Sequence, residues 1–337
     1  MTTNRRTALL GAATIALAAT IATPAAAQEQ SFILTTATTG GTYYPVGVAL
    51  ATLVKVKLQA SDGIDMSAIS SAGSGENIKL MREGQAQFGI LQGLFGRYAA
   101  KGSGPLEGEG KQEWLRSISM LWQNVEHFIT TEDLAPTGTI DDLKGFAGKP
   151  FSIGAKNSGT EGSGREILNG LGIDPESMDL VYQGYGPTAE GLQNGTIVGA
   201  NMPGGVPVSA VTQAFAARDD LVILDFTAEQ IERANGGDEL WTAYVIPAES
   251  YPGQAEDAST IAQPNFLGVH ADIDEEAVYK VTKTMFENLG FLQNIHPATK
   301  AMSLEAALAG LPAPLHPGAV RYYQEAGVEI PARLMPN

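Results

Sequence analysis

The sequence predicts an α/β fold of two lobes, each a mostly parallel sheet flanked by helices. Short apolar runs typical of strands alternate with segments whose apolar residues recur at three- and four-residue steps, as on one face of a helix. The 310 residues after residue 27 are too many for one typical domain and enough for two hydrophobic cores. Alternation and length together therefore favour two α/β units.

The first unit reads as a series of strands, each followed by a turn and a helix. A turn that is rich in glycine follows its first strand, and Val46, Leu50 and Leu53 mark the helix after it. The ordered segments that we predict for this unit span residues 32–38, 66–70, 88–92, 114–121 and 126–130, with a second turn at 72–77.

The second unit repeats this alternation. Its predicted elements are a short helix at 140–145, strands at 151–154, 180–182 and 197–200, and a capped turn at 156–161 that opens a helix. An apolar strand at 267–270 and a helical tail from residue 275 return the chain to the first lobe. We expect the first lobe to comprise residues 28–130 and 263–337, and the second lobe residues 131–262.

Residues 1–27 have the pattern of an export signal. Arg5 and Arg6 form a charged start, residues 8–22 are apolar but too short to span a bilayer comfortably, and residues 25–27 offer a small-residue cleavage site. The paired arginines resemble a twin-arginine signal, so export by the Sec or the Tat route stays open. The exported part is therefore predicted to begin at residue 28.

Composition excludes several classes of function. The chain has no cysteine, which rules out thiol catalysis and thiolate metal sites. Its net charge is −16, and −18 without the two arginines of the export signal, which argues against nucleic acid as a partner. An anionic ligand would be repelled at long range, so its binding would depend on local dipoles.

The turn at residues 39–45 is the strongest candidate for such a site. A turn between a strand and a helix aims free backbone N–H groups at whatever lies beyond the end of the strand. In this turn we take Thr39, Gly41, Thr42 and Tyr43 as ligand-binding candidates. The loop after the strand at 197–200 adds Pro203 and Gly204, because loops at the carboxyl ends of strands face the cleft in α/β folds.

No catalytic, metal or cofactor motif emerges from the chain. The four histidines are far apart, without the spacing of a metal-binding helix, and no nucleophile elbow, phosphate loop or dinucleotide fingerprint occurs. We therefore expect no enzyme activity, no metal and no cofactor. An exported hydrolase with a convergent site remains the alternative from a different class.

The order of several short segments resembles the TAXI-type solute-binding proteins of TRAP transporters over nearly all of the chain after the export signal. The segments that carry the resemblance are 39–47, 73–77, 84–92, 142–145, 152–154, 157–160, 246–253, 279–283 and 314–319.

This resemblance implies a type II periplasmic-binding-protein fold, a Venus flytrap that closes on a small carboxylate in the periplasm and docks on an integral-membrane TRAP permease. We expect such a protein to be a monomer. The resemblance also carries over a ligand-binding role to residues on four loops, which are Gly41, Thr42, Tyr43, Ser74, Asn77, Gln92, Ser158, Gly159 and Thr160.

One departure from the family pattern concerns the ligand. Family members often have an acidic residue two positions after the glutamine of the third strand, where this chain has Leu94. Without a partner for an ammonium group, we expect a dicarboxylate or a keto acid rather than an amino acid. Arg97 is a further candidate partner of a carboxylate. The same fold also serves ABC permeases and membrane sensors, so those partners stay open.

Overall fold

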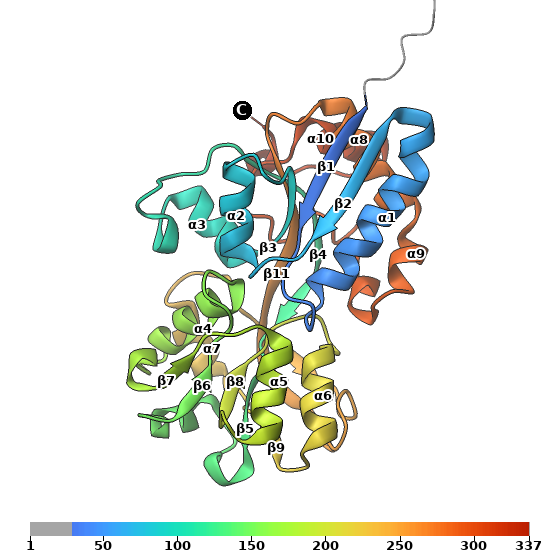
Figure 1. The fold of residues 1–337 in the computed structure, drawn as a ribbon. Helices are drawn as coiled ribbons and strands as arrows, with labels where there is room; N and C mark the ends of the chain where they lie inside the picture. Colours follow the sequence, from blue (N-terminus) through green and yellow to red (C-terminus); the bar gives the residue numbers. More distant parts are fainter. Residues whose placement is uncertain (1–28, 337) are drawn as a thin grey trace, which may run out of the picture.

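The computed structural model describes residues 29–336, which form two lobes joined by long strands (Figure 1). The predicted α/β fold of two lobes is confirmed. The predicted export signal lies outside the described residues. Within the described part, no helix has both the length and the apolar character that crossing a bilayer requires.

The sheet of the first lobe contains three neighbouring parallel strands. They are joined by crossover helices, as parallel pairing requires. One strand of opposite direction lies beside β3, and two further strands pair antiparallel with that strand, so the sheet is mixed rather than mostly parallel. The parallel strands are β1 (Gln30–Thr35), β2 (Ile64–Ile69) and β3 (Phe88–Gln92); the others are β4 (Leu115–Val125), β10 (Thr242–Ile246) and β11 (Ala258–His270); the crossover helices are α1 (Tyr43–Asp62) and α2 (Ser74–Arg82).

The sheet of the second lobe repeats this plan in smaller form. Three parallel strands lie in the order β7-β6-β8, and two antiparallel strands follow beside β8. The strands are β5 (Phe128–Thr131), β6 (Pro150–Ser152), β7 (Asp179–Val181), β8 (Gly199–Asn201) and β9 (Leu221–Ile223); the helices are α4 (Gly159–Gly170), α5 (Tyr185–Asn194), α6 (Ser209–Ala217) and α7 (Ala228–Asn235).

The remaining helices cover the first lobe and its edge. The carboxyl-terminal helices return to this lobe, where α8 packs against both α1 and α10 (Figure 1). Gly63 ends α1 in a left-handed conformation (φ 69°), which glycine adopts without steric cost. These helices are α3 (Gly93–Lys101), α8 (Glu275–Glu287), α9 (Leu289–Gln293) and α10 (Pro317–Glu325).

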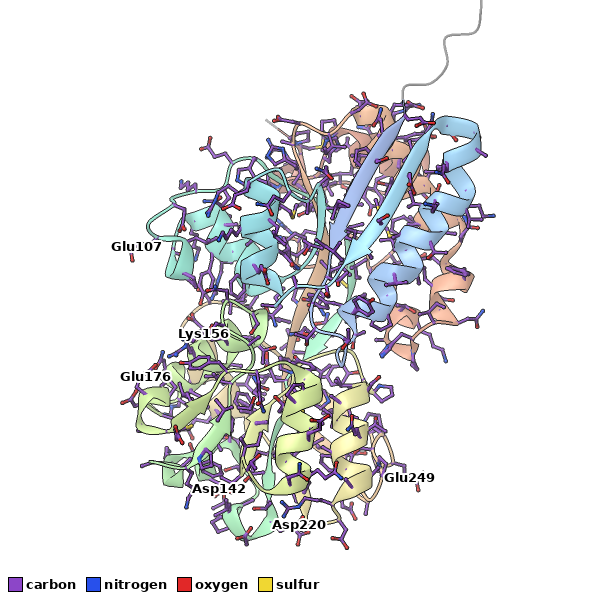
Figure 2. The ribbon with its side chains drawn as sticks, in the orientation of Figure 1. Glu107, Asp142, Lys156, Glu176, Asp220 and Glu249 are labelled. Carbon is purple, nitrogen blue, oxygen red and sulfur yellow. The ribbon has the colours of Figure 1, made fainter. Side chains whose placement is uncertain are left out.

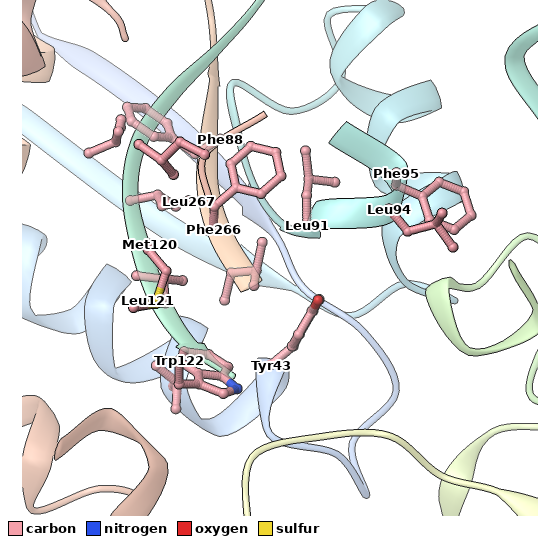
Figure 3. Packing of buried hydrophobic residues seen from close by; sticks show 14 of the residues in the cluster. Tyr43, Phe88, Leu91, Leu94, Phe95, Met120, Leu121, Trp122, Phe266 and Leu267 are labelled. Carbon is pink, nitrogen blue, oxygen red and sulfur yellow. The ribbon is translucent and has the colours of Figure 1, made fainter. Parts of the chain in front are cut away.

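The core of the first lobe is built on β3, every residue of which is buried. Phe88, Leu91 and Phe266 pack together there, and Tyr43 packs edge-on against Trp122, with ring centroids 6.0 Å apart (Figure 3). Burial of one such side chain contributes about 1.5–3 kcal/mol. The apolar cluster thus holds Tyr43, the first residue of α1, in a fixed position.

The chain crosses between the two sheets in short hinge segments. β4 belongs to the first sheet and β5 to the second, so the crossing falls between Val125 and Phe128. β11 pairs with β10, β4 and β3 in turn and forms the return path. The lobe boundaries expected from sequence, at 130/131 and 262/263, stay predictions.

Most predicted elements of the parallel units are present, and the differences are local. The strand at 88–92 has the predicted bounds, and residues 140–145 form a 3-10 helix. The strand predicted at 267–270 is only the end of β11, which starts at Ala258. β9 and β10 were not predicted from the sequence. β9 is only three residues long, and β10 is mostly exposed, so neither shows a regular alternation of buried and exposed residues.

Candidate functional site

The carboxyl ends of the parallel strands of both lobes converge on one cavity. In α/β folds this edge of the sheet is the usual place for a ligand. The loops after β1, β2, β3, β6, β7 and β8 each contribute to the walls, and β4 adds one residue. The cavity has a volume of about 30 Å³ and is lined by Ala37, Thr38, Gly41, Thr42, Tyr43, Ala72, Gly73, Ser74, Gln92, Asn124, Gly159, Thr160, Tyr185 and Pro203.

The structure brings eight of the twelve predicted site residues together in this wall. They come from both lobes and are Gly41, Thr42, Tyr43, Ser74, Gln92, Gly159, Thr160 and Pro203. The other four do not line the cavity and are Thr39, Asn77, Ser158 and Gly204. A ligand-binding role stays a prediction for all twelve.

Asn77 and Ser158 have their polar atoms committed to the protein itself. The Asn77 amide donates to the carbonyls of Thr36 (2.6 Å) and Ile90 (2.9 Å) and accepts from the hydroxyl of Thr35 (2.7 Å). Ser158 caps α4 by accepting from the N–H of Glu161 (3.0 Å). Both residues therefore shape the loops around the cavity.

Four helices begin at the cavity wall and present backbone donors there. They are α1, α2, α4 and α5, which start at Tyr43, Ser74, Gly159 and Tyr185, respectively. The first N–H groups of a helix have no partner within it. Among the described residues, the N–H groups of Ser74 and Gly159 have no other acceptor. The positive ends of four helix dipoles therefore meet at this cavity.

Most hydroxyl groups of the wall are bound to other groups of the protein, and that of Thr42 joins the two lobes. The Thr42 hydroxyl donates to the carbonyl of Gly205 (3.2 Å) and accepts from its N–H (3.0 Å). Tyr185 donates to the carbonyl of Pro203 (2.5 Å), so the Thr160 hydroxyl donates to Tyr185 (2.9 Å). These hydrogens are not available to a ligand in this conformation.

The two lobes touch directly beside the cavity. The N–H of Glu76, on α2, donates to the carbonyl of Asn157 in the other lobe (3.0 Å). A Cβ atom at Gly159 would lie 2.6 Å from the Gln92 side chain, so only glycine fits there. The space open to the centres of water molecules is only about 30 Å³, so the closed lobes leave little room between them.

Asn124 lines the cavity without having been predicted from sequence. It lies near the end of β4, just before the hinge, and is 1% exposed. No sequence motif marks Asn124, because it lies within an antiparallel strand. Only the tertiary structure shows that it lines the cavity. Tyr185, at the start of α5, also lines the wall; its place after β7 was the available signal.

No charged side chain lines the cavity within residues 29–336. The nearest carboxyl that affects it belongs to Glu126, in the hinge, which is fully buried and accepts from the Asn201 amide (2.7 Å). Burial raises the pKa of Glu126 to about 7, against the effect of that hydrogen bond. Burial likewise raises the pKa of the phenol of Tyr43 far above its ordinary value. Both residues are therefore neutral below pH 7.

The neighbouring hinge residue, His127, has a complete set of hydrogen bonds. Its Nδ1 faces the carbonyl of Val125 (2.8 Å), and its Nε2 faces the hydroxyl of Tyr251 (2.7 Å). Burial lowers the pKa of His127 to about 4. The neutral ring thus holds the hinge without adding positive charge near the cavity.

Leu94 and Arg97 both lie outside the wall of the cavity. Leu94 is fully buried, and its N–H donates to the side chain of Gln263 (2.7 Å). The guanidinium of Arg97 pairs with Asp238 (2.6 Å) and Glu166 (3.5 Å). Arg97 therefore bridges α3 to the other lobe, with its charge already engaged.

Known structures share this two-lobed fold at low sequence identity. A protein of Bordetella bronchiseptica RB50 aligns with 13% identity and a TM-score of 0.52, over 91% of this chain and 85% of that one. MatC of Rhodopseudomonas palustris, solved with bound malate, aligns with 12% identity and a TM-score of 0.51, over 88% and 96%. The periplasmic aliphatic sulphonate binding protein SsuA of Escherichia coli aligns with 10% identity and a TM-score of 0.45, over 91% and 96%.

The fold is accordingly shared with MatC and with the Bordetella protein. A family model adds evidence at the level of sequence, because it matches residues 34–327 and so spans both lobes and every loop of the cavity. This chain belongs to the NMT1-like family.

Proposed function

We propose that this protein captures a small organic anion between its lobes in the periplasm and delivers it to a TRAP-type permease in the membrane. The observation that carries the proposal is the meeting of four helix N-termini, from both lobes, at one uncharged cavity. Backbone N–H groups stabilise a carboxylate there without a cationic side chain.

The lobes must separate before a ligand can enter the cavity, which supports reversible capture rather than permanent binding. Contacts such as that between Glu76 and Asn157 form only when the lobes are closed. A ligand that adds hydrogen bonds to both lobes favours the closed state over the open one. A permease can then recognise the closed form.

The chemistry of the wall favours an acid without an ammonium group. No acidic side chain lines the cavity in the described chain. An amino acid would leave its ammonium group without a charged partner, which is costly in a buried site. We therefore propose a dicarboxylate or a keto acid as ligand.

A thermal-shift titration of the purified protein against mono-, di- and keto-carboxylates tests this function. A ligand at a hundred times its Kd stabilises the folded state by about 2.7 kcal/mol. The expected result is a saturable rise of the melting temperature with a carboxylate and none with glutamate. Turnover of ester or phosphoester substrates, without any such shift, would support a hydrolase instead.

The type of permease requires a separate test. In proteoliposomes that contain the candidate permease, uptake of the labelled ligand should require this protein and an ion gradient. Uptake that requires ATP and no ion gradient would assign the protein to an ABC system. Tight binding with no uptake by either system would favour a membrane sensor as partner.

A further inference from the structure

Two buried side-chain amides of the cavity have free hydrogen-bonding atoms. The amide of Asn265 joins Tyr43 to Asn124: its oxygen accepts from the Tyr43 hydroxyl, and its nitrogen donates to the oxygen of Asn124 (3.4 Å). This chain of bonds orients the Asn124 amide with its nitrogen free. Among the described residues, Asn124 Nδ2 has no acceptor, although the residue is 1% exposed.

The second free amide belongs to Gln92, at the end of β3. Its backbone N–H donates to the Ser74 hydroxyl (3.0 Å), which fixes the position of the residue. Its side-chain oxygen is buried, and within the described chain it accepts no hydrogen bond. Gln92 is 3% exposed and lies against Gly159 of the other lobe. A buried amide of this kind is costly unless something in the cavity binds to it.

The donors of the wall are enough for one carboxylate. The free nitrogen of Asn124 and the first N–H groups of α2 and α4 all offer hydrogens to the same small space. A second carboxylate would have only the N-termini of α1 and α5 left to bind it, with no cation among the described lining residues. Leaving such a charge buried and unpaired is strongly unfavourable.

The size of the cavity supports the same conclusion. The space open to the centres of water molecules is about 30 Å³, so the closed cavity suits a small ligand, and a larger one requires more separation of the lobes. That separation weakens the bonds of Thr42 to Gly205 and of Glu76 to Asn157. A short ligand keeps most of them.

We propose that the ligand is a short acid with a single carboxylate and an oxygen on the adjacent carbon, a 2-oxo or 2-hydroxy monocarboxylate. This inference rests on the proposed function. Asn124 and the helix N-termini hold the carboxylate, and the Gln92 amide binds the oxygen on the second carbon. An amide suits either oxygen, because it donates to an oxo group and accepts from a hydroxyl group.

Calorimetric titration of the wild-type protein with pyruvate, lactate, propionate and succinate tests this assignment. Propionate lacks the oxygen on the second carbon, and succinate carries a second carboxylate. We expect pyruvate or lactate to bind at least about tenfold more tightly than either, because a lost hydrogen bond to a buried amide costs about that factor.

Two variants separate the roles of the amides. Gln92→Leu should bring the affinity for pyruvate and lactate down to that for propionate, while propionate binding stays within about twofold. Asn124→Leu should weaken all three monocarboxylates by about tenfold or more. Gln193→Leu, on the exposed end of α5, is the matched control and should bind as the wild type does.

The wild-type ranking alone decides the inference even if a variant fails to fold. Tighter binding of succinate than of pyruvate and lactate overturns it and leaves the proposed function standing. Equal affinity for propionate and pyruvate also overturns it, because Gln92 would then bind no oxygen of the ligand. Absence of binding for every carboxylate, dicarboxylates included, overturns the proposed function as well.

Discussion

The cavity and the surface groove beside it differ in the groups that could bind a charged ligand. The cavity offers backbone N–H groups and side-chain amides, and the groove offers charged side chains. The groove, which we call the outer groove, has a volume of about 850 Å³ and runs along both lobes. It contains the cations Lys79, Arg82, Lys156 and Arg165 together with an equal number of glutamates, whereas no charged side chain of the described residues lines the cavity. If cationic side chains alone decided the site, an anion would bind in the outer groove.

The cations of the outer groove are largely engaged with other groups. Arg165 pairs with Glu161 (3.3 Å) and also with Glu176, and Arg82 lies 3.6 Å from Glu109. Lys156 lies over the ring of Tyr182, at 4.8 Å from its centre. Exposed charged residues such as Lys156 and Glu176 project outward from the lobes (Figure 2). Exposed pairs of this kind contribute little and are screened by salt.

The difference shows that free partners matter more than formal charge. The amides and helix N-termini of the cavity are uncharged, but several are buried without a partner, so a ligand gains from binding to them. In the outer groove the charges are stronger, yet solvent and neighbouring side chains already satisfy them. Four predictions test this contrast, in order of decreasing effect.

The largest effect concerns Glu126, the one carboxyl that is buried near the cavity. Its pKa rises from 4.5 to about 7 on folding, so its contribution to the free energy of unfolding is full below pH 4.5 and is lost as the pH rises through 7. The loss amounts to about 3 kcal/mol. Glu126→Gln should remove it. Urea unfolding should therefore find the variant about 3 kcal/mol more stable, relative to wild type, at pH 8 than at pH 4.5.

The neighbouring His127 should show the opposite dependence of stability on pH in the same experiment. Its pKa is lowered on folding, so the stability that it contributes is present above pH 6.5 and is lost as the pH falls towards 4. Because His127 is unchanged in Glu126→Gln, this variant should still lose stability as the pH falls below 6.5. Glu107→Gln, on the surface, is the control. A difference between Glu126→Gln and wild type that does not change with pH would contradict the neutral state of Glu126.

The second effect is on closure. A side chain at Gly159 would meet Gln92 at 2.6 Å and hold the lobes apart. Since overpacking of this kind costs about 1–3 kcal/mol, Gly159→Val should weaken pyruvate binding by about tenfold to a hundredfold in calorimetry. Gly290→Val, at a position with open space, should not. Unchanged affinity in Gly159→Val would show that the ligand does not require these two loops to meet.

A smaller effect is expected at Asn157, where the outer groove meets the cavity. Its φ of 62° is left-handed, which asparagine tolerates and valine does not. Its carbonyl accepts from Glu76 only across the closed lobes. Asn157→Val should lower the affinity by about five- to tenfold, while Asn157→Gly stays within about twofold. Equal binding by the two variants would exclude a role for this contact in closure.

The smallest effect is expected in the outer groove itself. Arg82→Ala and Lys156→Ala each remove one cation of the outer groove, which is half-buried in Arg82 and exposed in Lys156. Because charges in contact with solvent contribute about 0–1 kcal/mol, the affinity for pyruvate should change by less than about twofold in calorimetry at 150 mM salt. A tenfold loss in either variant would move the site from the cavity to the outer groove.

Sequence alone predicted the parts of this architecture that depend on local pattern. Strand, turn and helix recur in a fixed order, so Gly41, Ser74 and Gly159 were expected at the same edge of their sheets, and they line one cavity. The strand at 88–92 could be predicted because its apolar residues end at Gln92. Glycine-rich turns before amphipathic helices are strong local signals.

Features that depend on contacts between distant parts of the chain could not be predicted. Asn124 enters the wall only because β4 continues towards the hinge, and its free nitrogen results from a bond to Asn265, 141 residues away. Asn77 gave the same signal as Ser74, yet it points beneath the cavity, where Thr36 and Ile90 use its amide. The local sequence does not show which residues in the first turn of a helix will face the cavity.

The most direct test of the account is a crystal structure of the protein with a bound monocarboxylate such as pyruvate. The account predicts carboxylate oxygens within hydrogen-bond distance, about 2.7–3.2 Å, of Asn124 Nδ2 and of the first backbone nitrogens of α2 and α4. Density for the ligand among the lysine and arginine side chains of the outer groove, with the cavity unchanged, would contradict it.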